Sequence, residues 1–116
     1  MKRVLMVDDR EQNHAKLRPL LVGKVELVSA LTIEEAERLF ENGEQFDAII
    51  MDACVPGNRP TTVPLVEMIR RGGFTGSMIA VSSEGFYRKQ LVEAGCDCQI
   101  ENRWDLAAKI FELLGV

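Results

Sequence analysis

The stretch Phe46–Asp52, FDAIIMD, is the most hydrophobic of the strand-length runs in the chain, and it ends on a carboxylate. A nearly continuous apolar run of this length is typical of a strand that is buried on both faces of a parallel sheet. Such a sheet needs helices on both faces, because each face must be covered. This stretch therefore predicts an α/β fold in which residues 46–52 lie in the middle of the sheet.

The same alternation of apolar runs and helical segments continues along the whole chain. Runs of strand length are separated by segments in which apolar residues recur with helical period, which is the pattern of βαβ units. We therefore expect an α/β fold with a doubly wound sheet of five parallel strands and five helices. The expected strands are Arg3–Val7, Val25–Ser29, Phe46–Asp52, Met78–Ser83 and Cys96–Ile100, of which the last has the weakest apolar pattern.

Local signals mark several helix ends. Thr32 and Glu35 form a capping-box pattern at the start of the second helix, and Gly43 is placed to end it. Gly72 lies where the third helix should stop, and a fourth helix is expected around Phe86–Ala94. These signals agree with the strand pattern about where the elements alternate.

The composition is 47% hydrophobic and 28% charged, which is typical of a soluble globular chain, and the length fits one domain, residues 1–116. Fourteen Lys and Arg against 18 Asp and Glu give a net charge of −4, which argues against direct, sequence-independent nucleic-acid binding.

No apolar run reaches the ~18 residues of a membrane span, and acids interrupt the amino-terminal MKRVLMVDD, so we expect a cytoplasmic protein. The three cysteines lack paired metal-site spacing, which favours reduced thiols.

Acidic side chains follow two of the expected strands. Asp8 and Asp9 come directly after the first strand, and Asp52 ends the third. The carboxyl ends of the strands in a doubly wound sheet open onto one crevice, so these carboxylates should meet there, with Ser82 and Asn102 on the same edge. Three carboxylates suit a hard divalent cation such as Mg²⁺. One of them could then act as a nucleophile that accepts a phosphoryl group, with a nearby hydroxyl donating to a phosphate oxygen.

The motifs of the whole chain resemble those of receiver domains of two-component response regulators. VDD follows the first strand, FDAIIMD leads to VPG, AVSS lies at the fourth strand, and EAGCD leads into the fifth. The resemblance implies a flavodoxin-like sheet in the order 2-1-3-4-5. The acidic pair, the Asp-x-x-x-Pro spacing and the serine are specific only in combination.

The resemblance also implies roles for individual residues. By motif, Asp52 corresponds to the phosphoacceptor, and Asp8 and Asp9 to acids that bind the metal together with Asp52. Cys54 corresponds to the position whose backbone carbonyl also reaches the metal, and Ser82 to the switch hydroxyl. The implied cofactor is Mg²⁺ or another divalent cation. The implied chemistry is self-phosphorylation of a phosphoacceptor rather than turnover by an enzyme.

Two positions near the end of the chain depart from the family pattern. Asn102 stands where the family has a lysine, and Gln99 stands where it has a switch aromatic. A neutral hydrogen bond contributes ~0.5–1.5 kcal/mol against ~1.5–3 kcal/mol for a charged one, so Asn102 should support a phosphoryl group less well. Arg103 is the nearest cation, but neighbouring side chains on a strand point to opposite faces. Asn102 is also well suited to cap the last helix.

The leading hypothesis is a receiver domain that takes a phosphoryl group from a histidine kinase or phosphotransfer protein onto Asp52. It would then change its binding of a downstream effector protein or domain. The alternative is a degenerate pseudo-receiver, a protein interaction module that works without phosphorylation. The resemblance also allows a homodimer through the last strands and helices, and the sequence favours neither a nucleic-acid nor a membrane partner.

Two further expectations concern single side chains. His14, the only histidine, is polar and early in an amphipathic helix, so we expect it at the surface. Phe86, Tyr87 and Trp104 lie near the fourth and fifth helices, where the interior is favoured at least as much as an interface.

Overall fold

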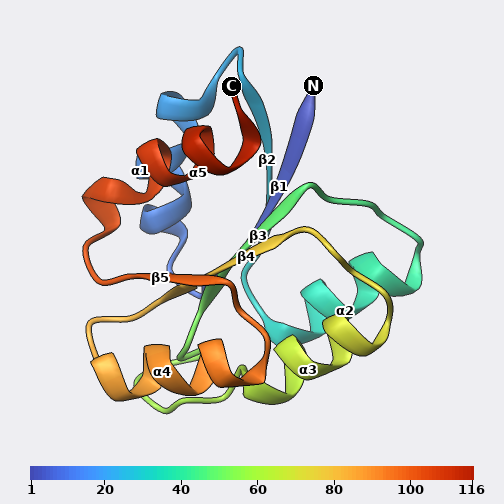
Figure 1. Cartoon of the computed structure of the whole chain (residues 1–116), viewed down its shortest axis with the longest axis vertical. Coiled ribbons are helices and arrows are strands. Elements are labelled where there is room, and N and C mark those ends of the chain that lie inside the picture. The colour runs from blue at the N-terminus through green and yellow to red at the C-terminus, as the bar shows by residue number, and fades with distance from the viewer.

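Five parallel strands form one sheet in the order β2-β1-β3-β4-β5 in the computed structural model, which describes all of residues 1–116 (Figure 1). The predicted fold class and strand order are therefore confirmed. The strands are β1 (Lys2–Val7), β2 (Val25–Ala30), β3 (Ala48–Asp52), β4 (Ser77–Val81) and β5 (Cys98–Ile100).

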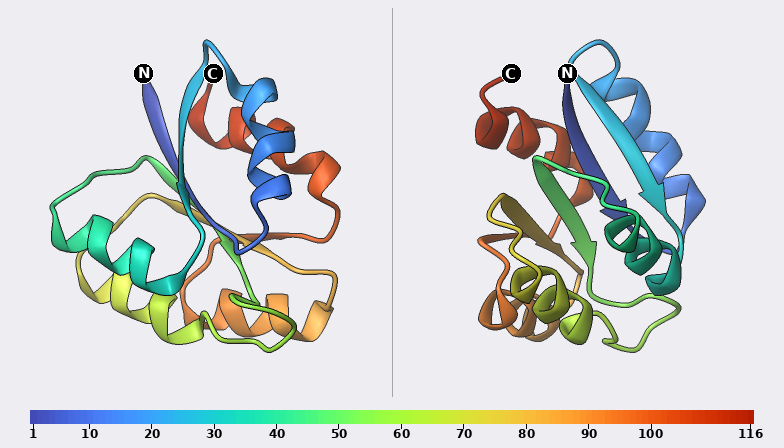
Figure 2. Two further views of the ribbon diagram at one scale, coloured as in Figure 1. Left: turned by 180° about the vertical axis from the view of Figure 1, so that it is seen from behind. Right: turned by 90° about the vertical axis from the view of Figure 1, so that its right-hand side faces the viewer.

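Five helices cover the two faces of the sheet, as expected from the sequence. They are α1 (Glu11–Leu21), α2 (Ile33–Glu41), α3 (Val63–Arg71), α4 (Gly85–Ala94) and α5 (Leu106–Leu114). Helices α1 and α5 lie together on one face, and α2, α3 and α4 lie on the other (Figures 1 and 2). A short 3₁₀ turn, η1 (Arg103–Asp105), precedes α5 and was not expected from the sequence. None of these helices has the length and apolar character that crossing a membrane would require.

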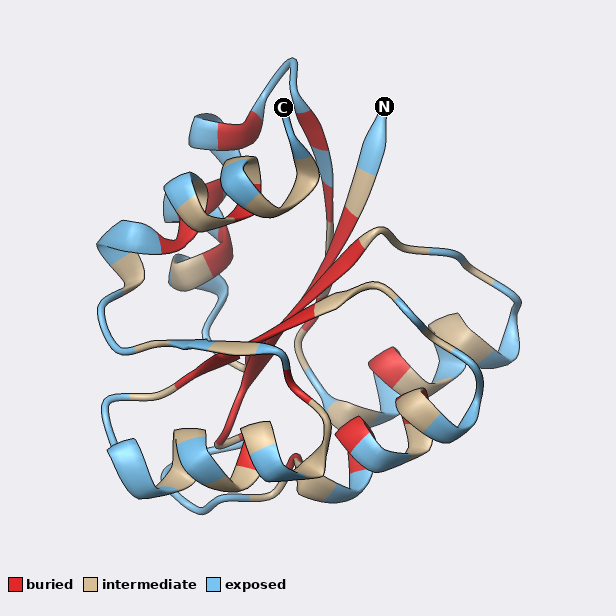
Figure 3. Ribbon diagram, in the orientation of Figure 1, coloured by how far each residue is buried: buried red, intermediate tan, exposed pale blue.

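Each face of the sheet packs into its own hydrophobic core. Successive side chains of a strand point to opposite faces, so Leu5 and Val7 of β1 pack with α2, α3 and α4, whereas Val4 and Met6 pack with α1 and α5. All four side chains are completely buried. Figure 3 shows that buried residues are concentrated along the central strands, which explains the continuous apolar runs in the sequence.

Strand β3 begins at Ala48, two residues later than Phe46, because the preceding residues have other partners. Asp47 exchanges hydrogen bonds with Arg3, since its carboxylate accepts from the Arg3 N–H at 2.8 Å and its own N–H donates to the Arg3 carbonyl at 2.8 Å. Phe46 packs against Phe40 in an edge-to-face pair, with ring centroids 5.6 Å apart.

Thr32 caps α2 as predicted, but the reciprocal contact of Glu35 is shifted by one residue. The Thr32 hydroxyl accepts from the Glu35 N–H at 3.0 Å, and the Glu35 carboxylate accepts from the N–H of Leu31, one residue before the cap, at 3.0 Å. After the helix, Gly43 adopts a φ of 78°, a left-handed conformation that glycine accommodates without a steric penalty.

Candidate functional site

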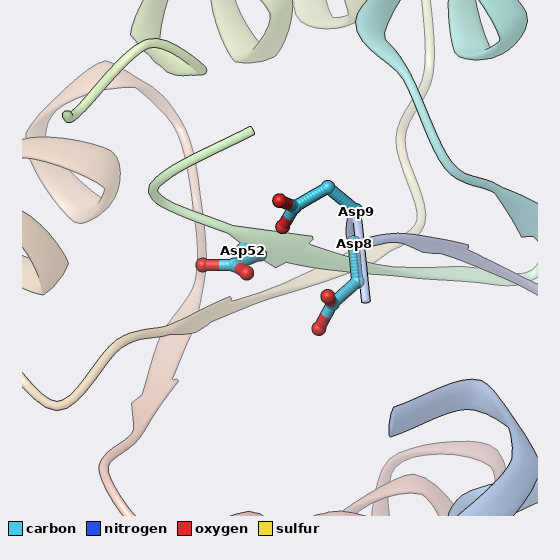
Figure 4. A group of neighbouring side chains, drawn as sticks. All are labelled: Asp8, Asp9 and Asp52. Carbon is cyan, nitrogen blue, oxygen red and sulfur yellow. The ribbon is translucent and has the colours of Figure 1, made fainter. Parts of the chain in front are cut away.

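The acidic residues Asp8, Asp9 and Asp52 meet at the carboxyl ends of β1 and β3, as the sequence predicts (Figure 4). The register explains the meeting, because Val7 pairs with Met51 in the parallel ladder and the residues that follow are Asp8 and Asp52. One carboxylate oxygen of each residue lies within 4.8 Å of the others. Three anionic side chains are thus held together by the two central strands.

Asp8 is completely buried, and both of its carboxylate oxygens are occupied. Oδ1 accepts a hydrogen bond from the backbone N–H of Arg10 at 2.9 Å. Oδ2 accepts from the Asn13 side-chain amide at 3.1 Å and lies 2.8 Å from Nη1 of Arg103. These donors fix the carboxylate in one orientation.

Asp52 is less deeply buried, with 8% of its surface exposed. Its Oδ1 accepts from the backbone N–H of Cys54 at 3.1 Å, and its Oδ2 lies 3.4 Å from Nη2 of Arg103. Burial is the largest influence and raises the pKa of Asp52 to about 6, and the charges of Asp8 and Asp9 act in the same direction. The Cys54 N–H and the Arg103 guanidinium oppose this rise in pKa. Asp52 therefore remains an anion at neutral pH in a site that disfavours its charge.

Asp9 lies at the edge of the site and is partly exposed. Its Oδ2 accepts from the N–H of Gly57 at 3.1 Å, a contact that ties the loop after β3 to the end of β1. Gly57 has a φ of 79°, which glycine adopts at little cost. The loop after Asp52 is thus anchored to the same acidic group.

The predicted residues Ser82 and Asn102 follow β4 and β5 at this edge, but neither is drawn into the acidic cluster. The Ser82 hydroxyl accepts from the N–H of Glu84 at 3.0 Å. The Asn102 side chain is exposed and accepts from the N–H of Trp104 at 2.9 Å, so it caps η1, as its residue type allows.

Arg103 is the nearest cation in the sequence and was expected to point away from the site, but the structure shows the opposite. Its guanidinium spans the two acids, with Nη1 2.8 Å from Asp8 Oδ2 and Nη2 3.4 Å from Asp52 Oδ2. The expectation that Arg103 would point away assumed a strand. Strand β5 instead ends at Ile100, and Arg103 opens η1, so the alternation of strand side chains does not apply. The sequence signal that could have indicated this contact is the group of three carboxylates, because clustered carboxylates favour a cation beside them.

The surface position predicted for His14 is wrong. His14 is 2% exposed, and its Nε2 lies 2.8 Å from the backbone carbonyl oxygen of Asp8. The helical spacing explains the burial, because His14 continues the inward stripe of Leu17 and Leu21 at i, i+3 and i+7. The hydrogen bond compensates for burying a polar ring.

The interior position considered for the aromatic residues is wrong for two of the three. Phe86 is 66% exposed and Trp104 is 87% exposed, whereas Tyr87 is half-buried and packs against the core beneath α4. Phe86 lies in the first turn of α4, and Trp104 lies in η1. Both positions therefore precede the inward stripes of their helices.

Gln99, at the aromatic position of the family, is exposed and tied to α4. Its Oε1 accepts from Nε of Arg88 at 2.9 Å, and Nη1 of the same arginine donates to the Ser82 carbonyl at 2.6 Å. Arg88 thus connects the loop after β4, the helix α4 and the strand β5 through one guanidinium.

The donor set of this site fits a hard divalent cation. Three carboxylates face a single guanidinium, which leaves an excess of negative charge, and carboxylate oxygens are the ligands that Mg²⁺ prefers. Burial is the main cause of the raised pKa of Asp52, and the charges of Asp8 and Asp9 add to it. The three cysteines are free, and Cys54, half-buried beside Asp52, contributes its backbone to the site.

No protein-family model and no curated protein matches the sequence. Solved structures match over almost the whole chain. A CheY-like response regulator receiver domain protein from Methanospirillum hungatei JF-1 is 26% identical, with a TM-score of 0.81, and the match covers 99% of this chain and 94% of that one. The response regulator TrrA from Thermotoga maritima, in complex with Mg²⁺-BeF, is 26% identical, with a TM-score of 0.78 and coverage of 97% and 99%. A two-component response regulator from Clostridium difficile shares the fold at 21% identity, with a TM-score of 0.83 and coverage of 99% and 97%.

Proposed function

We propose that this chain, which has the fold of a response regulator receiver domain, accepts a phosphoryl group on Asp52 and switches its binding of a partner. The observation that carries the proposal is the carboxylate of Asp52 at the end of β3, grouped with Asp8 and Asp9 within 4.8 Å. One receiver domain would occupy residues 1–116.

The proposed reaction transfers the phosphoryl group from a donor to the Asp52 carboxylate. An oxygen of Asp52 attacks the phosphorus of the donor, the bond between phosphorus and the donor atom breaks, and an aspartyl phosphate forms. Asp52 must be ionised to attack, so its pKa of about 6 leaves it competent at neutral pH. The chain would phosphorylate itself in this way and not turn over as an enzyme.

Asp8, Asp9 and Asp52 would hold Mg²⁺ or another divalent cation, with the backbone carbonyl of Cys54 as a further ligand implied by the family resemblance. A cation bound there would neutralise negative charge on the phosphoryl oxygens. The Ser82 hydroxyl would donate its proton to a phosphoryl oxygen, and it can do so while its oxygen accepts from the Glu84 N–H. Asn102 would at most offer a neutral amide, since its oxygen caps η1.

The proposed partners follow from the same fold. A histidine kinase or phosphotransfer protein would supply the phosphoryl group, and an effector protein or domain would respond. The exposed Phe86 and Trp104, on α4 and η1, are consistent with a protein partner or a second copy at the last strands and helices. We propose no direct nucleic-acid or membrane contact and a cytoplasmic location.

Intact mass tests the proposal directly. The wild-type chain is incubated with Mg²⁺ and a small acyl-phosphate donor, beside the variants Asp52→Asn and Asp105→Asn, the latter a matched change at an exposed acid. We expect the mass of one phosphoryl group on the wild type and on Asp105→Asn, only when Mg²⁺ is present, and none on Asp52→Asn. An adduct that persists on Asp52→Asn would refute Asp52 as the acceptor.

A pseudo-receiver is the second candidate, and specific contacts favour it. Arg103 already pairs with Asp8 and Asp52, and Gln99 is tied to Arg88 where the family has a mobile aromatic. A domain held in one state by such contacts would bind its partner without phosphorylation. The absence of any adduct on the wild type would select this candidate.

A further inference from the structure

Both carboxylate oxygens of Asp8 are in contact with other groups of the protein. Oδ2 of Asp8 accepts a hydrogen bond from the Asn13 amide and lies 2.8 Å from Nη1 of Arg103, with which it forms an ion pair. Oδ1 is held by the Arg10 N–H. Asp8 has no exposed surface through which an extra ligand could approach without displacing one of these groups.

Arg103 is the displaceable group among them. The donors Arg10 and Asn13 lie close to Asp8 along the chain, whereas Arg103 reaches it from the far end, from the loop that follows β5. Nη1 of Arg103 is buried and has no hydrogen bond of good geometry, so its contact with Asp8 is an ion pair only. The side chain is about one-third exposed and has solvent to move into.

The guanidinium also occupies the space that a cation would need. It lies between the Oδ2 atoms of Asp8 and Asp52, at 2.8 and 3.4 Å, and these two residues belong to the group of acids that could bind a metal. Two cations cannot share this space, because their repulsion at a few ångströms is strong in a partly buried site.

We propose that Arg103 is an internal counter-ion of the acidic site, and that a divalent cation binds Asp8 only as Arg103 leaves it. This inference rests on the proposed function in one respect, namely that the site takes a divalent cation. Arg103 and the cation exclude one another, so the affinity of the site for the cation is lowered by the free energy of the arginine contacts.

The exchange of Arg103 for a cation would also affect the structure outside the site, because Arg103 is the first residue of η1. Trp104 follows it, with its N–H bound to the Asn102 side chain, and α5 begins at Leu106. Withdrawal of Arg103 from Asp8 would release the contact that ties this turn to the acidic site. The released guanidinium is then free to bind an oxyanion at the mouth of the site.

Cation affinity measured without any phosphoryl donor tests this exchange. Mg²⁺ and Mn²⁺ are titrated by calorimetry into the wild type, Arg103→Gln, Arg103→Lys and the control Arg71→Gln, which removes the same charge from an exposed position at the end of α3. We expect Arg103→Gln to bind about tenfold more tightly than the wild type, because one positive charge leaves the site. Arg71→Gln should bind as the wild type does, and Arg103→Lys, which keeps the charge, should gain less than Arg103→Gln.

Fluorescence of Trp104, the single tryptophan, gives a second readout that does not depend on affinity. The wild-type spectrum should change as the cation binds, and the metal-free spectrum of Arg103→Gln should already resemble that of the cation-loaded wild type. Arg103→Lys keeps the test valid if the glutamine variant does not fold.

The outcomes separate this inference from the proposed function. Equal or weaker cation binding by Arg103→Gln, with an Asp52 adduct on the wild type, overturns the counter-ion role and leaves the phosphoacceptor proposal intact. Binding of the cation by none of the variants overturns the counter-ion role as well, and the absence of an adduct would then count separately against the proposed function.

Discussion

The Nε2 atom of His14 lies 2.8 Å from the backbone carbonyl oxygen of Asp8, so the first helix is fastened to the acidic end of β1 by a buried side chain. A carbonyl oxygen can only accept, so Nε2 carries the proton and donates. Nδ1 is buried without a partner. The ring is thus held by one hydrogen bond and by its packing beside Leu17 and Leu21.

Replacing His14 tests how much this contact stabilises the fold. His14→Phe keeps a ring of similar shape but removes the donor, so we expect a loss of about 1–3 kcal/mol in the free energy of unfolding. His14→Ala also leaves a cavity and should lose about 2–4 kcal/mol. Urea unfolding measures both, with Lys16→Ala on the exposed face of α1 as the control. A loss no larger than that of Lys16→Ala would contradict the buried role.

The raised pKa of Asp52 predicts a pH-dependent gain in stability when its charge is removed. In the absence of divalent cations, the unfolded chain releases the Asp52 proton near its usual pKa of 3.8, and the folded chain releases it near 6. The folded state therefore binds more protons between these values, and stability falls as the pH rises from about 4 to 6. Above pH 6 the full cost of about 2–3 kcal/mol is present.

Asp52→Asn removes this cost while keeping the shape of the side chain. We expect the variant to be more stable than the wild type by up to about 2–3 kcal/mol at pH 7 and to differ little below pH 4. The measurement is urea unfolding across this pH range in a chelator, with Asp105→Asn as the control. A difference that is constant with pH would show that Asp52 titrates as an ordinary carboxylate.

The fold and the acidic cluster could be predicted because they depend on local patterns. The apolar run of β3 and the strand-end positions of Asp8 and Asp52 bring two carboxylates together once β1 and β3 are neighbours in the parallel sheet. Arg103 could not be placed because its position depends on where β5 stops, and a three-residue strand gives little pattern to read. His14 was missed because residue polarity outweighed the helical spacing that in fact decided its burial.

Arg88 links α4 to β5, and we expect this contact to stabilise the fold. Its guanidinium donates to the Gln99 side chain at 2.9 Å and to the Ser82 carbonyl at 2.6 Å, and a lysine could not reach both with one amine. Arg88→Lys should therefore lower the free energy of unfolding by about 1–2 kcal/mol although it keeps the charge. Lys89→Arg, on the neighbouring exposed position, is the reverse exchange and should be neutral in the same urea titration.

The hydroxyl of Ser82 is expected to affect the rate of phosphorylation and not the identity of the acceptor. A neutral hydrogen bond to the phosphoryl group contributes about 0.5–1.5 kcal/mol, which corresponds to a slowing of roughly 2- to 10-fold in Ser82→Ala. The time course of the mass adduct with an acyl-phosphate donor and Mg²⁺ measures this, beside Ser83→Ala, where an exposed neighbouring hydroxyl is lost. The Ser82 oxygen accepts from the Glu84 N–H, which leaves its O–H proton free to donate to the phosphoryl group. Equal rates for the two variants would mean that the Ser82 hydroxyl does not contact the phosphoryl group and only shapes the loop after β4.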